Sequence, residues 1–304
     1  MRTNQFVTLL VAAFALAGPA AGQEPGEVEP KPLPRLANPA DPATPAKELF
    51  GRKSKPANLE ARAIGFYSRG CVAGATALPV DGKTWQVMRL SRNRNWGHPN
   101  LIALIERISA RVPKINGWPG LLVGDISQPR GGPMLTGHAS HQVGLDADIW
   151  LTPMPDRRLS RKEREEMSAT NLVREDREDV DPALYTPAHL ALIRAVSREP
   201  EVARIFINPA IKRAFCRDAG QDRAWLRKVR PIWGHNYHFH IRIACPDGQE
   251  GCKDQDPPQA DDGCGAELEK WLSPGYLFPT PGVPGPPLRM SALPAECKQV
   301  LVAP

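Results

Sequence analysis

The sequence lacks the short motifs that mark several common classes of enzyme and redox protein. No CxxC pair occurs, which argues against a zinc ribbon or a thioredoxin-type redox site. HExxH and GxSxG are also missing, so neither a helical zinc-peptidase site nor the nucleophile turn of α/β-hydrolases is present. The glycine-rich stretch 129–137 does not end in GKS or GKT, so it is interpreted as a loop lining a cleft rather than as a phosphate-binding loop.

Long apolar runs and internal repeats are lacking as well. The longest apolar run, residues 6–17, is shorter than the roughly 20 residues that a membrane-spanning helix needs. Because Arg2 precedes this run and small residues follow it, residues 1–22 are predicted to be a secretory signal peptide, cleaved near Ala17 or Gly22. The mature protein is therefore expected to be exported, periplasmic and without a membrane span.

What is present is the composition of a globular protein of 304 residues, with 41% hydrophobic and 24% charged residues. Such values exclude a wholly disordered or fibrous chain. The net charge of +6 favours an anionic partner such as nucleic acid, an anionic membrane surface or an anionic polymer, although simple arginine-rich usage is the alternative. Many of the 33 prolines lie in two stretches, which we interpret as a linker at 23–48 and a tail at 273–304 around one domain at 49–272.

Six cysteines remain in the mature chain, and an even number in an exported protein predicts three disulfides. Six cysteines allow 15 pairings. The short spacing of Cys245 and Cys252 favours a locally closed loop, and a bridge between Cys71 and Cys297 would pin both ends of the chain onto one domain.

Periodicity predicts helices interspersed with strands. Helices are expected at 101–112, with Asn100 as the N-cap, and at 187–199, while the charged stretch 158–168 is interpreted as a solvated helix or loop. Residues 145–151 and 237–243 alternate between apolar and polar side chains, which predicts half-buried strands. The expected fold class is α+β, with a small antiparallel sheet that carries the functional site.

Histidines are the most informative residues, because five of the seven lie in two short segments, GHASHQVGLDAD and WGHNYHFH. On a strand, His238 and His240 project from one face. If the second segment meets His141 and Asp148, the set provides three ligands for a divalent cation and leaves one position open, as in catalytic zinc sites. Packed histidines, or a metal-storing site without chemistry, are the alternatives.

Other polar residues near these segments are weighed separately. Asp146 is interpreted either as a carboxylate that orients a ligand histidine or as a solvated strand residue. Ser140 is discounted as a nucleophile, because no feature of the sequence activates its hydroxyl. His98 and His189 are not expected to be ligands.

The two histidine segments resemble those of the penicillin-insensitive murein endopeptidases, a family within the LAS group of zinc peptidases. The resemblance covers residues from about 50 to 272, and it extends through RNRNWGHP, RIFINPAIKRAFCRDAG, DRAWLRKVRPIWGH and DGCGAELEKW. It implies a zinc-dependent periplasmic endopeptidase that hydrolyses D-alanyl–meso-diaminopimelate cross-links in peptidoglycan.

The same resemblance implies roles for individual residues. It implies zinc binding by His138, His141, Asp148 and His240, and catalytic roles for His238 and His235. It also implies the disulfides Cys71–Cys297, Cys216–Cys264 and Cys245–Cys252. A second metal site of the family has only Asp176 and Asp179 as its nearest equivalents here, with no histidine, so that site is in doubt.

Two other functions compete with this interpretation. One is a D-Ala-D-Ala carboxypeptidase or dipeptidase of the same group, and the other is a non-enzymatic module that binds zinc or the cell wall. The histidines in excess of the expected ligands argue against the second. Cross-linked peptidoglycan peptides are the expected partner, nucleic acid is not, and a homodimer is left open.

Overall fold

The computed structural model describes residues 24–279 and 285–304, so the predicted signal peptide lies outside the described residues. The helices are α1 (Ala46–Phe50), α2 (Pro99–Asn116), α3 (Arg161–Glu166), α4 (Pro187–Ser197), α5 (Pro209–Asp218), α6 (Ala266–Trp271), α7 (Pro274–Leu277) and α8 (Glu296–Val302), with short 3-10 turns at Leu90–Arg92, Ala224–Lys228 and Met290–Ala292. The strands are β1 (Arg62–Phe66), β2 (Arg69–Ala73), β3 (Thr76–Ala77), β4 (Trp85–Val87), β5 (Trp96–Gly97), β6 (Leu121–Val123), β7 (Asp146–Trp150), β8 (Val202–Ile207), β9 (Val229–Pro231) and β10 (His238–Ile243).

A six-stranded sheet with the order β4-β6-β7-β10-β8-β9 organises the chain, and β1–β2 and β3–β5 form two smaller sheets. The four inner strands of the large sheet pair antiparallel, whereas both edge pairs, β4–β6 and β8–β9, are parallel. The α+β class is confirmed, because strands that pair mostly antiparallel are combined with separate helices. The two predicted strands lie at its centre as β7 and β10, with His240 directly opposite Asp148.

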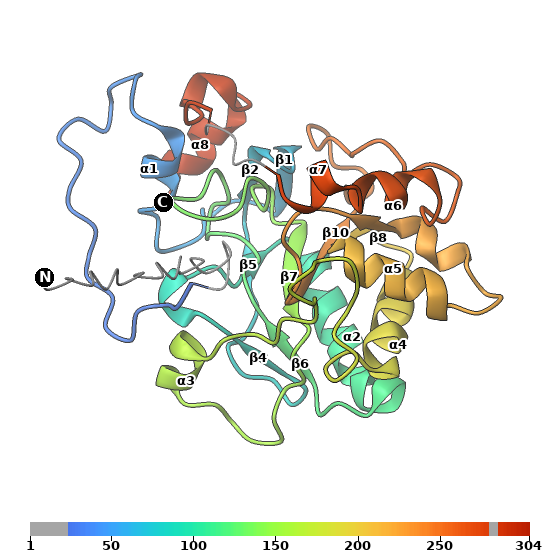
Figure 1. Cartoon of the computed structure of the whole chain (residues 1–304). Helices are drawn as coiled ribbons and strands as arrows, with labels where there is room; N and C mark the ends of the chain where they lie inside the picture. Colours follow the sequence, from blue (N-terminus) through green and yellow to red (C-terminus); the bar gives the residue numbers. More distant parts are fainter. Residues whose placement is uncertain (1–23, 280–284) are drawn as a thin grey trace, which may run out of the picture.

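One face of this sheet is covered by helices. The inward-facing residues Ala147, Ile149, Phe239 and Ile241 are buried in the main core. Buried residues of α2, α4 and α5 belong to the same core, and Figure 1 shows these three helices beside one another next to the sheet. Burial of this apolar face is the main favourable term for the central domain.

The helices α2 and α4 each begin with a proline in the first turn, directly after the N-cap residue. The helix predicted at 101–112 begins earlier, at Pro99, and its N-cap is His98, whose ring accepts a hydrogen bond from the backbone N–H of Asn100. The prediction of Asn100 as the cap is therefore wrong, because an imidazole nitrogen two residues earlier accepts the free N–H. α4 begins with Pro187 in the first turn, as predicted.

The strands β7 and β10 differ from the prediction in one respect. Every residue of both strands is buried, so they are not half-buried. The polar side chains do share one face, as the alternation predicts, but other segments of the chain cover that face. Likewise, α3 is not a fully solvated helix, because Arg164 and Glu165 are buried.

Three disulfides stabilise the periphery, and no free cysteine remains. The predicted pairs Cys71–Cys297, Cys216–Cys264 and Cys245–Cys252 are confirmed. The first joins β2 to α8 across 226 residues, within a second small core that also includes buried residues of α1. In the part of the chain that the structure describes, no helix has both the length and the apolar character required to cross a bilayer.

Candidate metal centre

The centre is built on the polar face of β7 and β10. Asp148 lies opposite His240 and Trp150 lies opposite His238. Residues directly opposite one another in an antiparallel pair point to the same face. The pairing therefore holds Asp148, His238 and His240 side by side on rigid backbone, and each of the three side chains is almost fully buried.

The loop between β6 and β7 adds His138 and His141 to this face. A hydrogen bond of 3.0 Å from the backbone N–H of His141 to Asp146 Oδ2 anchors the loop to β7. Gly144, which has a left-handed φ of 71°, allows the chain to turn between His141 and the strand, as the sequence predicts. His141 Nδ1 lies 2.6 Å from the carbonyl oxygen of Ile126 and must carry the proton there, so Nε2 keeps its lone pair.

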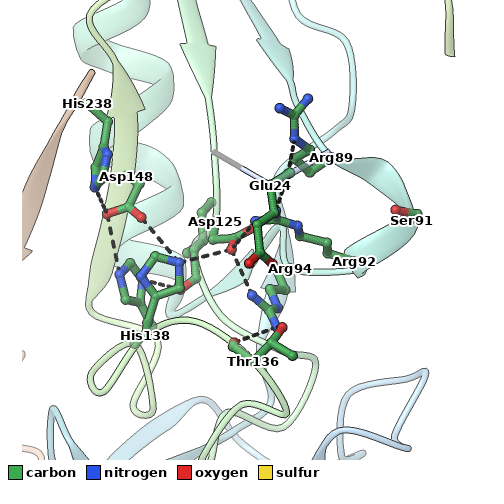
Figure 2. A network of polar contacts seen from close by, with 12 residues as sticks. Glu24, Arg89, Ser91, Arg92, Arg94, Asp125, Thr136, His138, Asp148 and His238 are labelled. Carbon is green, nitrogen blue, oxygen red and sulfur yellow. Dashed lines mark hydrogen bonds and ion pairs between the residues drawn. The ribbon is translucent and has the colours of Figure 1, made fainter. Parts of the chain in front are cut away.

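Four imidazoles surround the carboxylate of Asp148. Its Oδ1 lies 3.3 Å from His240 Nδ1, 3.4 Å from His141 Nε2 and 3.6 Å from His238 Nε2. Its Oδ2 lies 3.5 Å from His138 Nε2, and Figure 2 shows Asp148 between His138 and His238. The histidine segments, almost a hundred residues apart in sequence, therefore meet at one side chain.

The donors of this group fit a metal ion. The buried atoms His141 Nε2, Asp148 Oδ1 and both ring nitrogens of His238 make no hydrogen bond among the described residues. Ligand atoms of His138, His141 and Asp148 all lie within 4.8 Å of one another, and His240 Nδ1 approaches the same carboxylate. Unpaired buried polar atoms are costly, and a divalent cation is the partner that satisfies imidazole and carboxylate donors together.

Asp146 orients this group from below. It is fully buried, accepts hydrogen bonds from Arg242 Nε at 2.8 Å and Nη2 at 3.1 Å, and lies 3.0 Å from His240 Nε2. Burial opposes its ionisation, but Arg242 and His240 outweigh that cost and lower the pKa of Asp146. Of the two interpretations of Asp146, the structure supports a carboxylate that orients a ligand histidine and excludes a solvated strand residue.

Asp125 was missed by the sequence analysis. It lies two residues after the end of β6 and is buried, with Oδ2 3.0 Å from His138 Nε2, 3.0 Å from Arg92 and 2.9 Å from Arg94. Although burial raises the pKa of Asp125, Arg94 and His138 lower it below its usual range. An acid immediately after a continuous apolar run, LLVGD, is the signal that could have identified it, because polar residues at strand ends often line sites.

The surroundings divide the histidines by charge. Burial lowers the pKa of His141, and it lowers the pKa of His238 to about 4, so both are neutral at pH 7. For His138 and His240 burial acts in the same direction, but nearby carboxylates prevail: Asp148 and Asp125 raise the pKa of His138, and Asp146 raises that of His240 to about 8. Binding of a cation to His240, which is largely protonated at pH 7, must therefore release a proton.

His235 completes the group at its edge. Its ring centroid lies 4.6 Å from that of His238 and 6.0 Å from that of His240. The residue has a left-handed φ of 54°, and its Nδ1 lies 2.7 Å from the carbonyl oxygen of Trp233. Strain of this kind is tolerated where surrounding structure holds a residue in place. The structure thus brings together all six residues that the sequence singled out as ligands or catalytic residues: His138, His141, Asp148, His235, His238 and His240.

The remaining histidines and the acidic loop lie elsewhere in the structure. His98 caps α2, and His189 is buried at the start of α4 with Nε2 3.0 Å from the carbonyl oxygen of Leu151. Asp176 is exposed and pairs with Arg174, and Asp179 pairs with Arg217. Among the described residues, these two acids belong to no cluster able to hold a metal.

The first described residues of the chain border the centre. The carbonyl oxygen of Glu24 accepts hydrogen bonds from Arg89 Nε at 3.0 Å and Arg92 Nη2 at 2.6 Å. Figure 2 shows Glu24 beside Arg92, which also pairs with Asp125. The segment after the predicted signal peptide therefore packs against the rim of the centre.

Comparison with known proteins gives a consistent result. A family model described as penicillin-insensitive murein endopeptidase matches residues 63–302, which include every residue of the centre. A protein of that name from Klebsiella pneumoniae (strain 342) is 43% identical over 259 residues, 85% of this chain and 91% of that protein. Another from Haemophilus influenzae is 46% identical over 248 residues, 81% of this chain and 84% of that protein. A third, from Yersinia enterocolitica, is 43% identical over 259 residues, 85% of this chain and 90% of that protein.

Proposed function

The chain belongs to the penicillin-insensitive murein endopeptidase family, and from that premise we propose that it is a zinc-dependent endopeptidase of the cell wall. Its proposed reaction is hydrolysis of D-alanyl–meso-diaminopimelate cross-links in peptidoglycan. The observation that carries the proposal is the convergence of buried imidazole nitrogens on Asp148, where they make no hydrogen bond. Such a donor set has no structural use without a cation.

His141, Asp148 and His240 are the proposed zinc ligands, with His138 as a further ligand at the outer side of Asp148. A zinc ion supplies Lewis acidity: it lowers the pKa of a water molecule and polarises a carbonyl group. The hydrogen bond to the carbonyl oxygen of Ile126 holds the His141 ring in position, and the contact with Asp146 does the same for the His240 ring. These partners fix the ring orientations before any ligand arrives.

His238 and His235 are the proposed catalytic residues. His238 is neutral and lies next to the proposed ligands, so it accepts the proton of the attacking water. His235 lies beside His238 with its Nδ1 proton donated to the carbonyl oxygen of Trp233, so its Nε2 accepts a hydrogen bond from the attacking water and orients it. The proton that His238 has accepted is then delivered to the leaving amine.

Export to the periplasm belongs to the same proposal. Residues 1–22 act as the signal peptide, and the three disulfides support an oxidising compartment, where such bonds persist. The positive net charge favours retention on the anionic wall, an effect that weakens as salt is added. A domain at 49–272, flanked by a linker and a tail, and a homodimer stay predictions.

Digestion of purified cross-linked muropeptide dimers tests the function. The mature protein is expected to convert dimers to monomers, to lose this activity with a chelator and to regain it with added zinc. Loss of terminal D-alanine alone would favour the carboxypeptidase alternative, and metal binding without any cleavage would favour the non-enzymatic module. Asp176→Asn is the control, because Asp176 is an exposed acid outside the centre, and it should retain one metal per chain and full activity.

The base assignment has a separate test. His238→Ala is expected to retain most of the bound metal but to lose hydrolysis, because His238 is not among the proposed ligands and its removal takes away the proton acceptor. Metal content and dimer cleavage are measured on the same preparation. If the variant hydrolyses dimers at the parent rate, His238 is not the base.

A further inference from the structure

A large cleft adjoins the metal centre on the same side of the central sheet. Its volume is about 570 Å³, and its lining includes Arg204, Phe206, Arg230, Pro258 and Trp271. None of these residues belongs to the centre described above. The question is what this cleft accommodates.

Strand register puts the floor of the cleft on the face that carries the histidines. In β8, Phe206 lies opposite His240 of β10, and Arg204 lies opposite Arg242. In β9, Arg230 lies opposite Phe206. Since paired residues share a face, the floor of the cleft continues the metal-binding face across two further strands.

Direct side-chain contacts join the cleft to the centre. The Phe206 ring meets the His240 ring edge to face, with centroids 5.3 Å apart. The Arg242 guanidinium, which is bonded to Asp146, also lies 5.0 Å from the Phe206 ring. A chain that is cleaved at the centre can therefore extend over Phe206 into the cleft.

The three arginines along this floor differ in their partners. Arg242 pairs with Asp146, and Arg230 pairs with Asp261 and Glu267. Arg204 is half-buried, and it donates one hydrogen bond of 2.7 Å to the carbonyl oxygen of Asp256. Within residues 24–279 and 285–304, no carboxylate forms an ion pair with it. Burial and the charges of Arg242 and Arg230 lower the pKa of Arg204, and Glu267 acts in the opposite direction without pairing with it.

We propose that this cleft is a substrate subsite, in which Arg204 binds a free carboxylate on one peptide arm of the cross-linked substrate. The inference rests on the proposed function and names the group that the site recognises. Meso-diaminopimelate has two amino and two carboxyl groups, so a free carboxylate remains beside the amide nitrogen of the cross-link. The guanidinium of Arg204 can donate further hydrogen bonds to this carboxylate, because Arg carries five N–H groups and only one hydrogen bond of Arg204, to Asp256, is described. Phe206 and Pro258 offer apolar surface to the aliphatic part of that arm.

Two substrates and two variants test the proposal. Cleavage of muropeptide dimers is compared with cleavage of dimers whose diaminopimelate carboxylates are amidated. For Arg204→Gln we expect a rise in KM of about tenfold on the free-carboxylate dimer, with kcat changed less than about twofold, the pattern of a lost binding contact. Amidation should raise the KM of the parent by a similar factor and add little to that of the variant. Arg62→Gln, an exposed arginine on the separate β1–β2 sheet, is the charge-matched control and should behave as the parent.

The outcomes separate this inference from the proposed function. A parent that cleaves both dimers with equal KM overturns the carboxylate subsite but leaves the endopeptidase intact. A parent that cleaves neither dimer, with metal bound, overturns the endopeptidase itself, and this subsite with it. If Arg204→Gln does not fold, the amidated substrate still tests recognition of the carboxylate, and Arg204→Lys, which keeps the charge, tests the residue: it should bind the free-carboxylate dimer more tightly than the amidated one.

Discussion

The two faces of the central strands are equally buried but chemically opposite. On one face, Ala147, Ile149, Phe239 and Ile241 pack into the main core against helices. On the other, Asp148 and the neighbouring histidines carry buried atoms that make no hydrogen bond among the described residues. The first face provides stability and the second reduces it in the absence of a metal. Because successive side chains of a strand point to opposite faces, alternate residues of β7 and β10 stabilise the core, and the residues between them form the metal centre.

The sharpest test of this contrast is removal of a proposed ligand from the polar face. His240→Ala is expected to lose the bound metal and to reduce hydrolysis by about three orders of magnitude, equivalent to about 4 kcal/mol of activation free energy. Metal content and dimer cleavage provide the measurement. Retention of one tightly bound metal per chain would remove His240 from the ligand set.

Arg242→Met tests whether the polar face also contains an element needed for folding. It leaves the fully buried Asp146 without its arginine, and breaking a buried pair in this way lowers the free energy of unfolding by about 3–5 kcal/mol. Urea unfolding of the metal-free protein measures the change. The double variant Asp146→Asn, Arg242→Met should recover part of the loss, because it no longer buries a lone charge. A change below about 1 kcal/mol in the single variant would contradict the pairing.

Ile241→Ala is the counterpart on the apolar face, one residue from His240. Deleting these buried carbons should lower the free energy of unfolding by about 2–5 kcal/mol through lost burial and a residual cavity. The folded variant should still bind one metal per chain, as measured by elemental analysis below its unfolding transition. Loss of metal from folded protein would show that the two faces are not independent.

The smallest effect is expected at Asp125. Asp125→Asn removes the charge that pairs with His138, so metal affinity or activity should fall about 10–100-fold. Because Arg94 also loses its carboxylate partner, affinity is measured on protein shown to be folded. Competition with a chelator measures the affinity. Asp81→Asn, which interrupts the Asp81–Arg164 pair outside the centre, is the matched control and should bind metal as the parent does. Equal affinity of both variants would limit Asp125 to a structural role.

Much of the fold and centre is readable from local sequence. Alternation at 145–151 and 237–243 correctly predicts which side chains of β7 and β10 share a face. The full set of cysteine pairs, which the family resemblance implies, also matches the structure. Depth of burial is not readable in this way, because it depends on segments that cover the strand from elsewhere. The same limit explains the error at the start of α2, where an imidazole acts as the cap.

By itself, the amino-acid sequence determined the histidine segments, their strand periodicity and the family to which the chain belongs, because these are properties of neighbouring residues and of overall similarity. Only the tertiary structure decided that Asp146 orients His240, that Asp125 contacts His138 and that Arg204 faces a cleft beside the centre. Each of these facts depends on side chains from separate elements meeting across the sheet. No local period encodes which segment will cover a given face, since that is set by how the whole chain packs.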